Sequence, residues 1–491
     1  MISRVWRIKK TKITEKRNAV SLRDGGIVQQ INRWLRSPVY VHMAGLLAAL
    51  SNVFGLELPV YTIYILCGLY ISFFAEDYLP LMPLVIFCYI APSAGSNPAI
   101  NEDSVFYPQN GGIYLIVLAA LFAASVIWRL ITDPVFGGKK FLKAPRALQM
   151  GMLILGAAYV LGGVGSGFYL PNLGKNVLFG LVQFLAVFLA YWVFTGAVRW
   201  EMARKDYFAW IGFSTGCALL IQLINIYATG EVVVGGTIER EAIFTGWGMY
   251  NNIGSLLAVM IPCAGYLACR RHNGWLYNLG SLAFFIGVVF TCSRGSILGA
   301  AGAYCVSYML VLVKAKDKHA NMAAHFVTIL IFVLTVTVLG DVLVELFREL
   351  IDKGADPSTR DVIYEAGIQQ YLKFPVFGAT FYPSEFVPWD WATLESFSEL
   401  FPPRWHNTLI QMAACCGTAG LLAYGYHRVQ TIRMLARNLT LEKVFIVVSL
   451  TAFLGMSMLD CHMFNIGPTM LYSMLLAFAE KSIKGVKITF Q

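Results

Sequence analysis

Long apolar segments separated by short polar connections make up most of this chain. A membrane-spanning helix needs about 17 to 25 mostly apolar residues, and segments of about that length recur along the sequence. They cover residues 39–56, 58–75, 79–96, 112–131, 147–167, 176–197, 207–228, 247–269, 276–292, 296–314, 323–344, 407–426, 442–460 and 465–480. The pattern predicts an all-α polytopic membrane protein with about 12–14 transmembrane helices and one large external loop subdomain between two late spans.

The composition agrees with this prediction. Hydrophobic residues make up 57% of the 491 positions and charged residues 13%, whereas a soluble protein carries about 25% charged residues. The net charge is +10, but the basic residues concentrate near the N-terminus and in short loops, as the positive-inside rule requires. We therefore expect no nucleic-acid partner. The ten cysteines form no CxxC motif, so we expect neither a disulfide framework nor a zinc site.

The basic loops predict the orientation of the spans. Every strongly basic short loop falls on one side when the N-terminus is inside. These loops are Lys139 to Arg146, Arg199 to Lys205, Arg270-Arg271, Lys314 to Lys318, Arg428 to Arg437 and Lys481 to Lys487. The outside loops are then 97–111, 168–175, 229–246, 345–405 and 461–464. We expect a multi-pass protein with both termini in the cytoplasm.

These boundaries divide the chain into six parts. They are a basic cytoplasmic arm (1–38) that can lie on anionic lipid, N-terminal transmembrane helices (39–230), a transmembrane core (231–344), a large external loop (345–405), C-terminal transmembrane helices (406–480) and a cytoplasmic tail (481–491).

The large external loop contains a predicted helix followed by many aromatic residues. Ser358 is a typical helix cap with Asp361 three positions on, and Pro375 ends the helix. The expected apolar face is Val362, Ile363, Ala366, Tyr371 and Leu372. The aromatic residues are Phe374, Phe377, Phe381, Tyr382, Phe386, Trp389, Trp391, Phe397, Phe401 and Trp405. They are typical of membrane-interface anchors, and the alternative is a platform on which sugar rings stack.

Two histidines fall on the outer side. His406 lies where the long polar loop runs into an apolar segment, and a neutral imidazole accepts a proton near neutral pH. The alternative is that His406 is only an interfacial anchor. His462 lies in a very short turn without basic neighbours in sequence. Gly417 and Gly420, one turn apart, would let another helix approach closely.

The outward-facing arginines are few, and positive charge is disfavoured in short translocated loops. They are Arg240, Arg294, Arg348, Arg360 and Arg404. Each could form a salt bridge with an adjacent acid (Glu239, Glu241 or Asp361) or extend to lipid headgroups. A guanidinium at this surface also suits a diphosphate, because its planar fork binds phosphate oxygens in pairs.

Four segments, in order, resemble the membrane domain shared by bacterial O-antigen ligases and related O-antigen and capsule polymerases, which are membrane glycosyltransferases of the C type. They are Arg240 through Asn251-Asn252-Ile253-Gly254, Thr291 to Gly295, Arg360 through Phe374-Pro375-Val376-Phe377-Gly378, and His406-Asn407 followed by Gly417 and Gly420. The resemblance covers residues 230–425, with 231–344 as the ligase-like core. Leu421 and Thr380 depart from the ligase pattern, which leaves ligase and polymerase open.

The resemblance implies a glycosyltransferase in the bacterial cytoplasmic (inner) membrane that makes lipopolysaccharide, capsule or exopolysaccharide. Its donor would be a glycan linked to undecaprenyl diphosphate, and its acceptor a glycan or lipid A core. His406 would be the general base, with Arg240 and Arg360 binding the diphosphate without a metal or cofactor. Asn407 would orient the base or the sugar.

Further candidates surround these residues. Arg294 would brace the site through Asn251 or Asn252, and Arg404 and Trp405 would bind substrate beside His406. Glu57, in the first outer turn, is a minor catalytic candidate whose ordinary interpretation is structural.

Two other classes of function compete with the enzyme. A transporter or flippase of lipid-linked oligosaccharide would need charged or broken helices at mid-membrane, and the predicted spans hold few such charges, Arg129 lying near an inner end. A non-catalytic scaffold for polysaccharide assembly would use the aromatic loop as its docking face.

Overall fold

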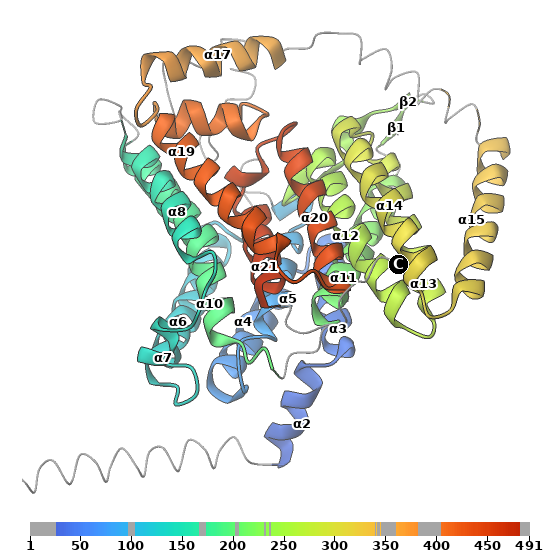
Figure 1. The fold of residues 1–491 in the computed structure, drawn as a ribbon, viewed down its shortest axis with the longest axis horizontal. Helices are drawn as coiled ribbons and strands as arrows, with labels where there is room; N and C mark the ends of the chain where they lie inside the picture. Colours follow the sequence, from blue (N-terminus) through green and yellow to red (C-terminus); the bar gives the residue numbers. More distant parts are fainter. Residues whose placement is uncertain are drawn as a thin grey trace, which may run out of the picture.

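The structure is a computed structural model, and it shows an all-α bundle (Figure 1). It describes residues 26–96, 104–165, 173–201, 206–229, 232–234, 237–338, 340, 344, 360–381 and 404–481. The predicted fold class, an all-α polytopic membrane protein, is confirmed. Among the described residues, seven helices are long and apolar enough to cross a membrane, or eight if α2 (Gly26–Leu35) and α3, which are bent by 65°, form one broken span.

Each predicted apolar segment coincides with a helix or a helix pair. In order these are α3 (Pro38–Phe54), α4 (Glu57–Phe74), α5 (Leu81–Ile90), α6 (Gly112–Thr132), α8 (Gln149–Val164), α9 (Leu173–Phe184) continued through a π turn (Leu185–Leu189) into α10 (Ala190–Ala197), α11 (Tyr207–Ala228), α12 (Tyr250–Arg270), α13 (Gly274–Phe290), α14 (Arg294–Lys314), α15 (Lys318–Val338), α19 (Thr408–Ala436), α20 (Leu441–Ser457) and α21 (Ile466–Lys481). A short helix, α7 (Lys139–Leu142), lies in a basic connection.

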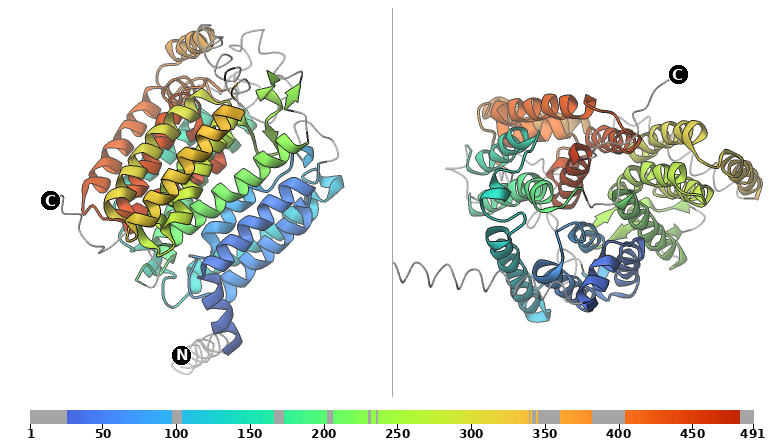
Figure 2. Two further views of the ribbon diagram at one scale, coloured as in Figure 1. Left: turned by 90° about the vertical axis from the view of Figure 1, so that its right-hand side faces the viewer. Right: turned by 60° about the horizontal axis from the view of Figure 1, so that its bottom comes forward.

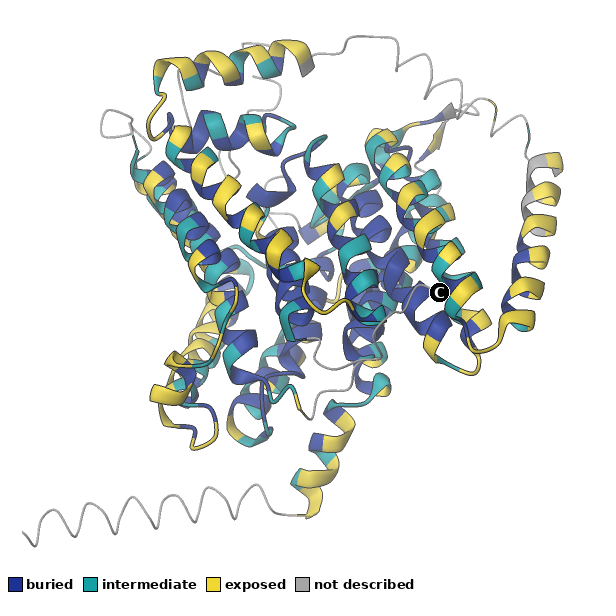
Figure 3. Ribbon diagram, viewed as in Figure 1, coloured by how far each residue is buried: buried dark blue, intermediate teal, exposed yellow. Residues whose placement is uncertain are grey.

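Helix α12 is the centre of the bundle. Every residue from Asn252 to Cys269 is buried because α11, α13, α14 and α20 pack around the helix. A helix that is apolar on every side is stable only when all its faces are covered. Figure 3 shows the contrast with peripheral helices such as α15, whose outward residues are exposed. In a membrane those exposed apolar faces contact lipid.

The two ends of the bundle differ (Figure 2). Helix α2 and the basic helix α7 lie at one end. The other end carries α17 (Arg360–Lys373) and two short hairpins, β1 (Val233–Val234) with β2 (Thr237–Ile238) and β3 (Phe244–Thr245) with β4 (Gly248–Met249). The span that was predicted to begin at residue 247 begins at Tyr250 as α12, because the second hairpin occupies the residues before it. We call this end the outer end.

Helix α19 differs most from its prediction. It contains a break at Gly417, where φ is 65° and ψ is −161°. Figure 1 shows the part before the break lying across the outer end and the rest descending through the bundle. The descending part therefore continues to Ala436, and His427 and Arg428 lie within the helix. Residues 428–436 of the predicted inner loop Arg428 to Arg437 are thus helical, and the side of the membrane on which they lie stays a prediction.

The helix predicted in the large loop is present as α17, but its buried face is different. Ile363, Gly367 and Gln370 face the bundle, whereas Val362 and Leu372 are exposed. The buried face is set by α19, because Gln370 Nε2 donates a hydrogen bond to the carbonyl of Ala414 at 3.0 Å. The proposed cap Ser358 lies outside the described residues.

Candidate functional site

The first turn of α19 fixes the position of His406 at the outer end. Asn407 is the N-cap, and its Oδ1 accepts hydrogen bonds from the backbone N–H groups of Leu409 (2.8 Å) and Ile410 (3.3 Å). His406 has a φ of 47°, which is uncommon for a residue with a side chain. Its carbonyl accepts a hydrogen bond from the Tyr364 hydroxyl of α17 at 3.3 Å. The imidazole is therefore held at a helix N-terminus by backbone contacts on both sides.

An acidic residue from a distant part of the sequence faces this imidazole. His406 Nδ1 lies 3.8 Å from Oδ1 of Asp460, in the connection between α20 and α21. This distance allows electrostatic attraction but is too long for a hydrogen bond. The connection is tied to α19, because Asn407 Nδ2 donates to the carbonyl of Met458 at 3.1 Å. Asn407 thus positions both halves of the pair, which favours the first of its two expected roles, orienting the base, over orienting the sugar.

The carboxyl of Asp460 is ionised at neutral pH. Its burial disfavours the charged form, but the guanidinium of Arg404, the backbone N–H of Cys461 and, when they are protonated, the rings of His462 and His406 outweigh that effect. The pKa of Asp460 therefore lies below its ordinary value of 3.8. An ionised carboxylate opposite Nδ1 favours the tautomer protonated there, so that Nε2 is the ring nitrogen that can accept a proton.

The second outer histidine is buried and belongs to a polar network. His462 is 2% exposed, and its Nε2 lies 2.9 Å from Ser255 Oγ on α12. Ser255 Oγ lies 3.1 Å from Ser296 Oγ, which lies 2.9 Å from Ser293 Oγ. Ser293 Oγ also donates to Asn251 Oδ1 at 2.7 Å. The network links the connection after α20 to the starts of α12 and α14.

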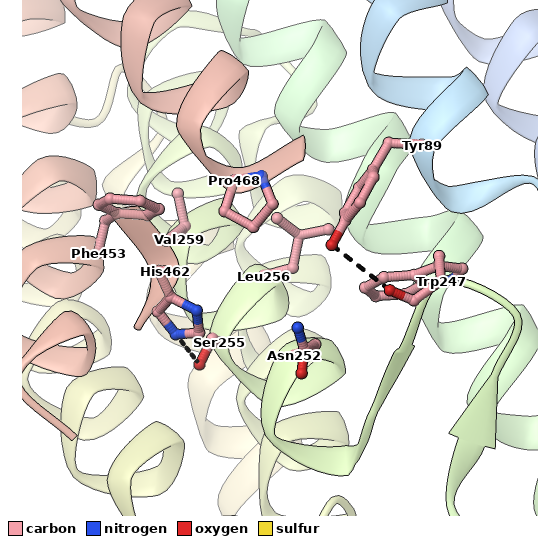
Figure 4. A pocket seen from close by; sticks show the side chains of 9 residues that line it. All are labelled: Tyr89, Trp247, Asn252, Ser255, Leu256, Val259, Phe453, His462 and Pro468. Atoms are coloured by element: carbon pink, nitrogen blue, oxygen red, sulfur yellow. Dashed lines mark hydrogen bonds between the residues drawn. The ribbon is translucent and has the colours of Figure 1, made fainter. Parts of the chain in front are cut away.

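A small pocket opens beside His462 (Figure 4). It is lined by Tyr89, Trp247, Asn252, Ser255, Leu256, Val259, Phe453, His462 and Pro468. The rings of Tyr89 and Trp247 have their centroids 5.4 Å apart, and Trp247 Nε1 donates to Gln222 Oε1 at 3.1 Å. The pocket has a volume of about 10 Å³, room for about one water molecule. In this conformation it admits a water or a hydroxyl group but not a sugar ring.

The two predicted diphosphate-binding arginines are placed differently. Arg240 lies in a 3₁₀ turn, where its Nε donates to Glu241 Oε1 at 2.8 Å and its guanidinium lies 5.3 Å from the centroid of the Tyr250 ring. The salt bridge weighed as the alternative for Arg240 is thus present. Arg360 is the first residue of α17, and its side chain lies outside what the structure describes. Convergence of both arginines on His406 stays a prediction.

The other predicted residues separate into binding and packing positions. Arg404 is near enough to act electrostatically on Asp460 and His462. Trp405 is 1% exposed and packs near Gly367 of α17, which favours a structural role over substrate binding. Phe381 is also fully buried. Neither ring is an interface anchor or part of an exposed sugar platform, and most of the other aromatic residues of the loop lie outside the described part.

The asparagines and Glu57 also have defined places. Asn252 lines the pocket, and Asn251 accepts its hydrogen bond from Ser293, the neighbour of Arg294. Arg294 itself is exposed at the first residue of α14. Glu57 is 2% exposed, and its Oε1 accepts a hydrogen bond from the backbone N–H of Ser93 at 2.7 Å. This contact supports the structural interpretation of Glu57.

Sequence reasoning missed Asp460 and Ser255 as site residues and undervalued His462. Asp460 and His462 are close in sequence. The presence of an acid and a histidine in one short outer turn is the sequence signal that could have identified both as site residues. Their proximity to His406 and Ser255 depends on how α20 and α21 pack. Among the residues that the structure describes, no group of three or more His, Cys, Asp or Glu side chains could hold a metal ion.

The fold and the site together define a polytopic membrane protein with a histidine–carboxylate pair at one end of its bundle. Residues 279–425 match the family model described as O-antigen ligase. The chain therefore carries an O-antigen ligase family domain, which confirms the resemblance for α13 to the upper half of α19. Such a domain indicates a membrane enzyme that ligates or polymerises surface glycans. The first motif, Arg240 to Gly254, lies outside the match. A comparison with curated proteins finds no match to the chain.

Proposed function

We propose that this protein is a glycosyltransferase that moves a glycan from an undecaprenyl-diphosphate carrier to an acceptor hydroxyl at the external face of the bacterial cytoplasmic membrane. The observation that carries the proposal is the pair His406–Asp460, at 3.8 Å, at the start of the helix that closes the O-antigen ligase domain. The outer end of the bundle would face the exterior, since α2 and the basic helix α7 lie at the opposite end.

His406 would act as the general base. An acceptor hydroxyl is a poor nucleophile until its proton is removed as the new bond forms. The imidazole is partly exposed, with 34% of its side-chain surface accessible, so an acceptor can reach it. The ionised carboxylate of Asp460 would stabilise the imidazolium that results. In this scheme the acceptor oxygen attacks the anomeric carbon, the bond to the diphosphate breaks, and the proton remains on His406.

Guanidinium groups would stabilise the leaving diphosphate. Its negative charge grows as the glycosidic bond to phosphate breaks, and fixed cationic donors lower the free energy of that transition state. Arg404 is the arginine whose charge acts on Asp460 at this end. Arg360, at the N-terminus of α17, and Arg240 are the further candidates. Loss of one such donor would cost about 2.7–4 kcal/mol in the transition state.

The proposal is tested with purified protein and a labelled glycan on undecaprenyl diphosphate. His406→Ala should lower the transfer rate about 10²–10⁴-fold, the usual contribution of a general base, without loss of the folded protein. His272→Ala changes an exposed histidine at the opposite end of the bundle and should leave the rate unchanged. Equal rates for His406→Ala and the wild type would contradict the base assignment.

The transporter alternative gains one observation from the structure, because Arg428 lies within a membrane helix. Cells that produce the inactive His406→Ala variant separate the two classes. An enzyme leaves carrier-linked glycan at the outer leaflet, whereas a flippase leaves it at the inner leaflet. Accumulation at the inner leaflet would favour transport.

A further inference from the structure

A chain of three serine hydroxyl groups connects the ring of His462 to Asn251. Its four contacts are His462 Nε2 to Ser255 Oγ (2.9 Å), Ser255 Oγ to Ser296 Oγ (3.1 Å), Ser296 Oγ to Ser293 Oγ (2.9 Å) and Ser293 Oγ to Asn251 Oδ1 (2.7 Å). Each contact is short enough for a hydrogen bond, and each hydrogen bond needs one hydrogen atom between its partners.

The supply of hydrogen atoms in this chain fixes the tautomer of His462. A serine hydroxyl has one hydrogen, and the amide oxygen of Asn251 has none. The three serines therefore supply hydrogens for three of the four contacts, and the fourth must come from the imidazole. The backbone carbonyl of Asn251, 3.3 Å from Ser296 Oγ, is a further acceptor that adds no hydrogen. His462 thus carries a hydrogen on Nε2, whichever way the hydroxyl groups turn.

The other ring nitrogen of His462, Nδ1, is then left as a hydrogen-bond acceptor. Burial lowers the pKa of His462 below its ordinary value of 6.5, so at pH 7 the ring is neutral and only one of its nitrogens carries a hydrogen. Within the described part of the chain, no group forms a hydrogen bond with Nδ1. An acceptor in so buried a side chain is unfavourable until a donor reaches it.

The small pocket beside His462 can supply that donor. Figure 4 shows Nδ1 on the edge of the ring that faces the pocket. The pocket volume of about 10 Å³ gives room for one group of about the size of water. Most of the other walls are apolar, formed by Leu256, Val259, Phe453 and Pro468 among others, and such walls disfavour a charged donor. The group that fits is a neutral hydroxyl.

The exposed side of the pocket favours a hydroxyl carried by a sugar over a water molecule. Tyr89 and Trp247 are partly exposed, whereas the polar residues that line the pocket are buried. A buried water is usually held by about three hydrogen bonds, and the apolar walls supply few partners for it. The carbon-bound hydrogens of a sugar ring, in contrast, can pack against the two aromatic rings.

We infer that the pocket beside His462 binds one hydroxyl group of the glycan substrate, which donates its hydrogen to Nδ1 of His462. This inference rests on the proposed function, because it takes the substrate to be a glycan. The pocket lies near the proposed base, since Asp460 acts electrostatically on both His462 and His406. His462 is thus a substrate-binding residue that selects sugars with a hydroxyl at one position and orients them for reaction at His406.

Monodeoxy sugars test the hydroxyl by kinetics. Each hydroxyl of the two sugars that flank the new linkage is replaced in turn by hydrogen, in the carrier-linked donor or in the acceptor. One analogue should lower the kcat/KM of the wild type about a hundredfold or more, because it leaves Nδ1 buried and unpaired. Equal kcat/KM values for every analogue and the complete substrate would overturn the inference.

His462→Gln shows whether this discrimination depends on Nδ1. The glutamine Nε2 can still donate to Ser255, but the side chain offers no acceptor in the place of Nδ1. The variant should lower kcat/KM for the complete substrate and lose most of the discrimination against the one analogue. His272→Gln changes an exposed histidine at the opposite end of the bundle and should keep the discrimination. Full discrimination in His462→Gln would overturn the inference.

Nitrogen NMR of the wild type reads the same contact without turnover. Protein with isotopically labelled histidine is reconstituted in lipid, and the ring signals of His462 are assigned through its neighbours Cys461 and Met463. At neutral pH the hydrogen should be on Nε2. The carrier-linked glycan alone, or the acceptor alone, should shift the Nδ1 signal, and the one that does so carries the hydroxyl.

Two NMR results would overturn the inference. One is a hydrogen on Nδ1 at neutral pH, and the other is an Nδ1 signal that neither glycan shifts at saturation, which would leave a water molecule as the occupant. Failure of the proposed function gives a different result, because the wild type then transfers no glycan at all while Nδ1 can still respond to added glycan.

Discussion

The backbones of Gly417 and Gly378 lie in close contact, and neither position has room for a side chain. Both have a positive φ, 65° and 77°. A Cβ on Gly417 would lie 2.6 Å from the backbone nitrogen of Gly378, and one on Gly378 would lie 2.3 Å from the carbonyl carbon of Cys415. Backbone hydrogen bonds from Ala379 to Ala414 (2.9 Å) and from Thr418 to Pro375 (2.8 Å) accompany this contact. The segment after α17 is thereby fastened to the break in α19 at Gly417, which nine residues separate from Asn407.

This contact gives a prediction for Gly417. Gly417→Ala should lower the thermal stability of the purified protein and reduce transfer, because alanine at this φ costs about 1–3 kcal/mol and its methyl group would overlap Val376 and Gly378. Gly425→Ala is the matched control, since this helical glycine of α19 has no atom within 4 Å of an added Cβ. That control should be neutral or stabilising by up to about 1 kcal/mol. Equal melting temperatures for the two variants would contradict the close contact.

Thr380 is expected to be a strained residue that glycine improves. It is fully buried with a φ of 80°, and its hydroxyl is buried without a hydrogen-bond partner in the described structure. A β-branched residue in this region is a genuine outlier. Thr380→Gly should raise the unfolding temperature, by relief of about 1–3 kcal/mol of backbone strain. Thr380→Ala removes the hydroxyl but keeps the φ, so it should gain less; a larger gain for alanine would argue against backbone strain.

Asp460 is predicted to make His406 a stronger base without contacting the substrate itself. Asp460→Asn removes the negative charge at nearly constant size and should lower kcat about tenfold to a hundredfold, or about 1.4–2.8 kcal/mol, with a smaller change in KM. The pH–rate profile should also shift to lower pH, because an imidazole without its carboxylate partner is a weaker base. Glu365→Gln, an exposed acid on α17, should change neither. An unshifted profile in Asp460→Asn would remove Asp460 from the site.

His462 is expected to make stability depend on pH. Its burial lowers its pKa below the ordinary 6.5, with Asp460 opposing and Arg404 reinforcing this shift. Just below pH 6.5 the unfolded chain then binds a proton that the folded protein does not, so the free energy of unfolding falls as the pH falls. His462→Gln should flatten the decrease in melting temperature between pH 7 and pH 5. Exposed His319 serves as control, and His319→Gln should retain the wild-type slope.

The local pattern of the sequence was sufficient to locate the helices. Apolar runs of spanning length are a property of each segment alone, so the approximate positions of the long helices followed from them, although the break in α19 and its extension to Ala436 did not. The same holds for the end of α17 before Pro375, because proline cannot continue a helix, and for Asn407 at the start of α19. The family resemblance also lay within a contiguous stretch, and residues 279–425 match the O-antigen ligase family model.

The tertiary structure alone decided which of these residues meet. The break at Gly417 exists because another backbone segment supplies hydrogen bonds that a continuous helix would not need. Asp460 faces His406 because Asn407 holds the α20–α21 connection, and Trp405 is buried because α17 covers it. Each of these contacts joins segments far apart along the chain, and hydrophobic periodicity carries no information about which helix packs against which.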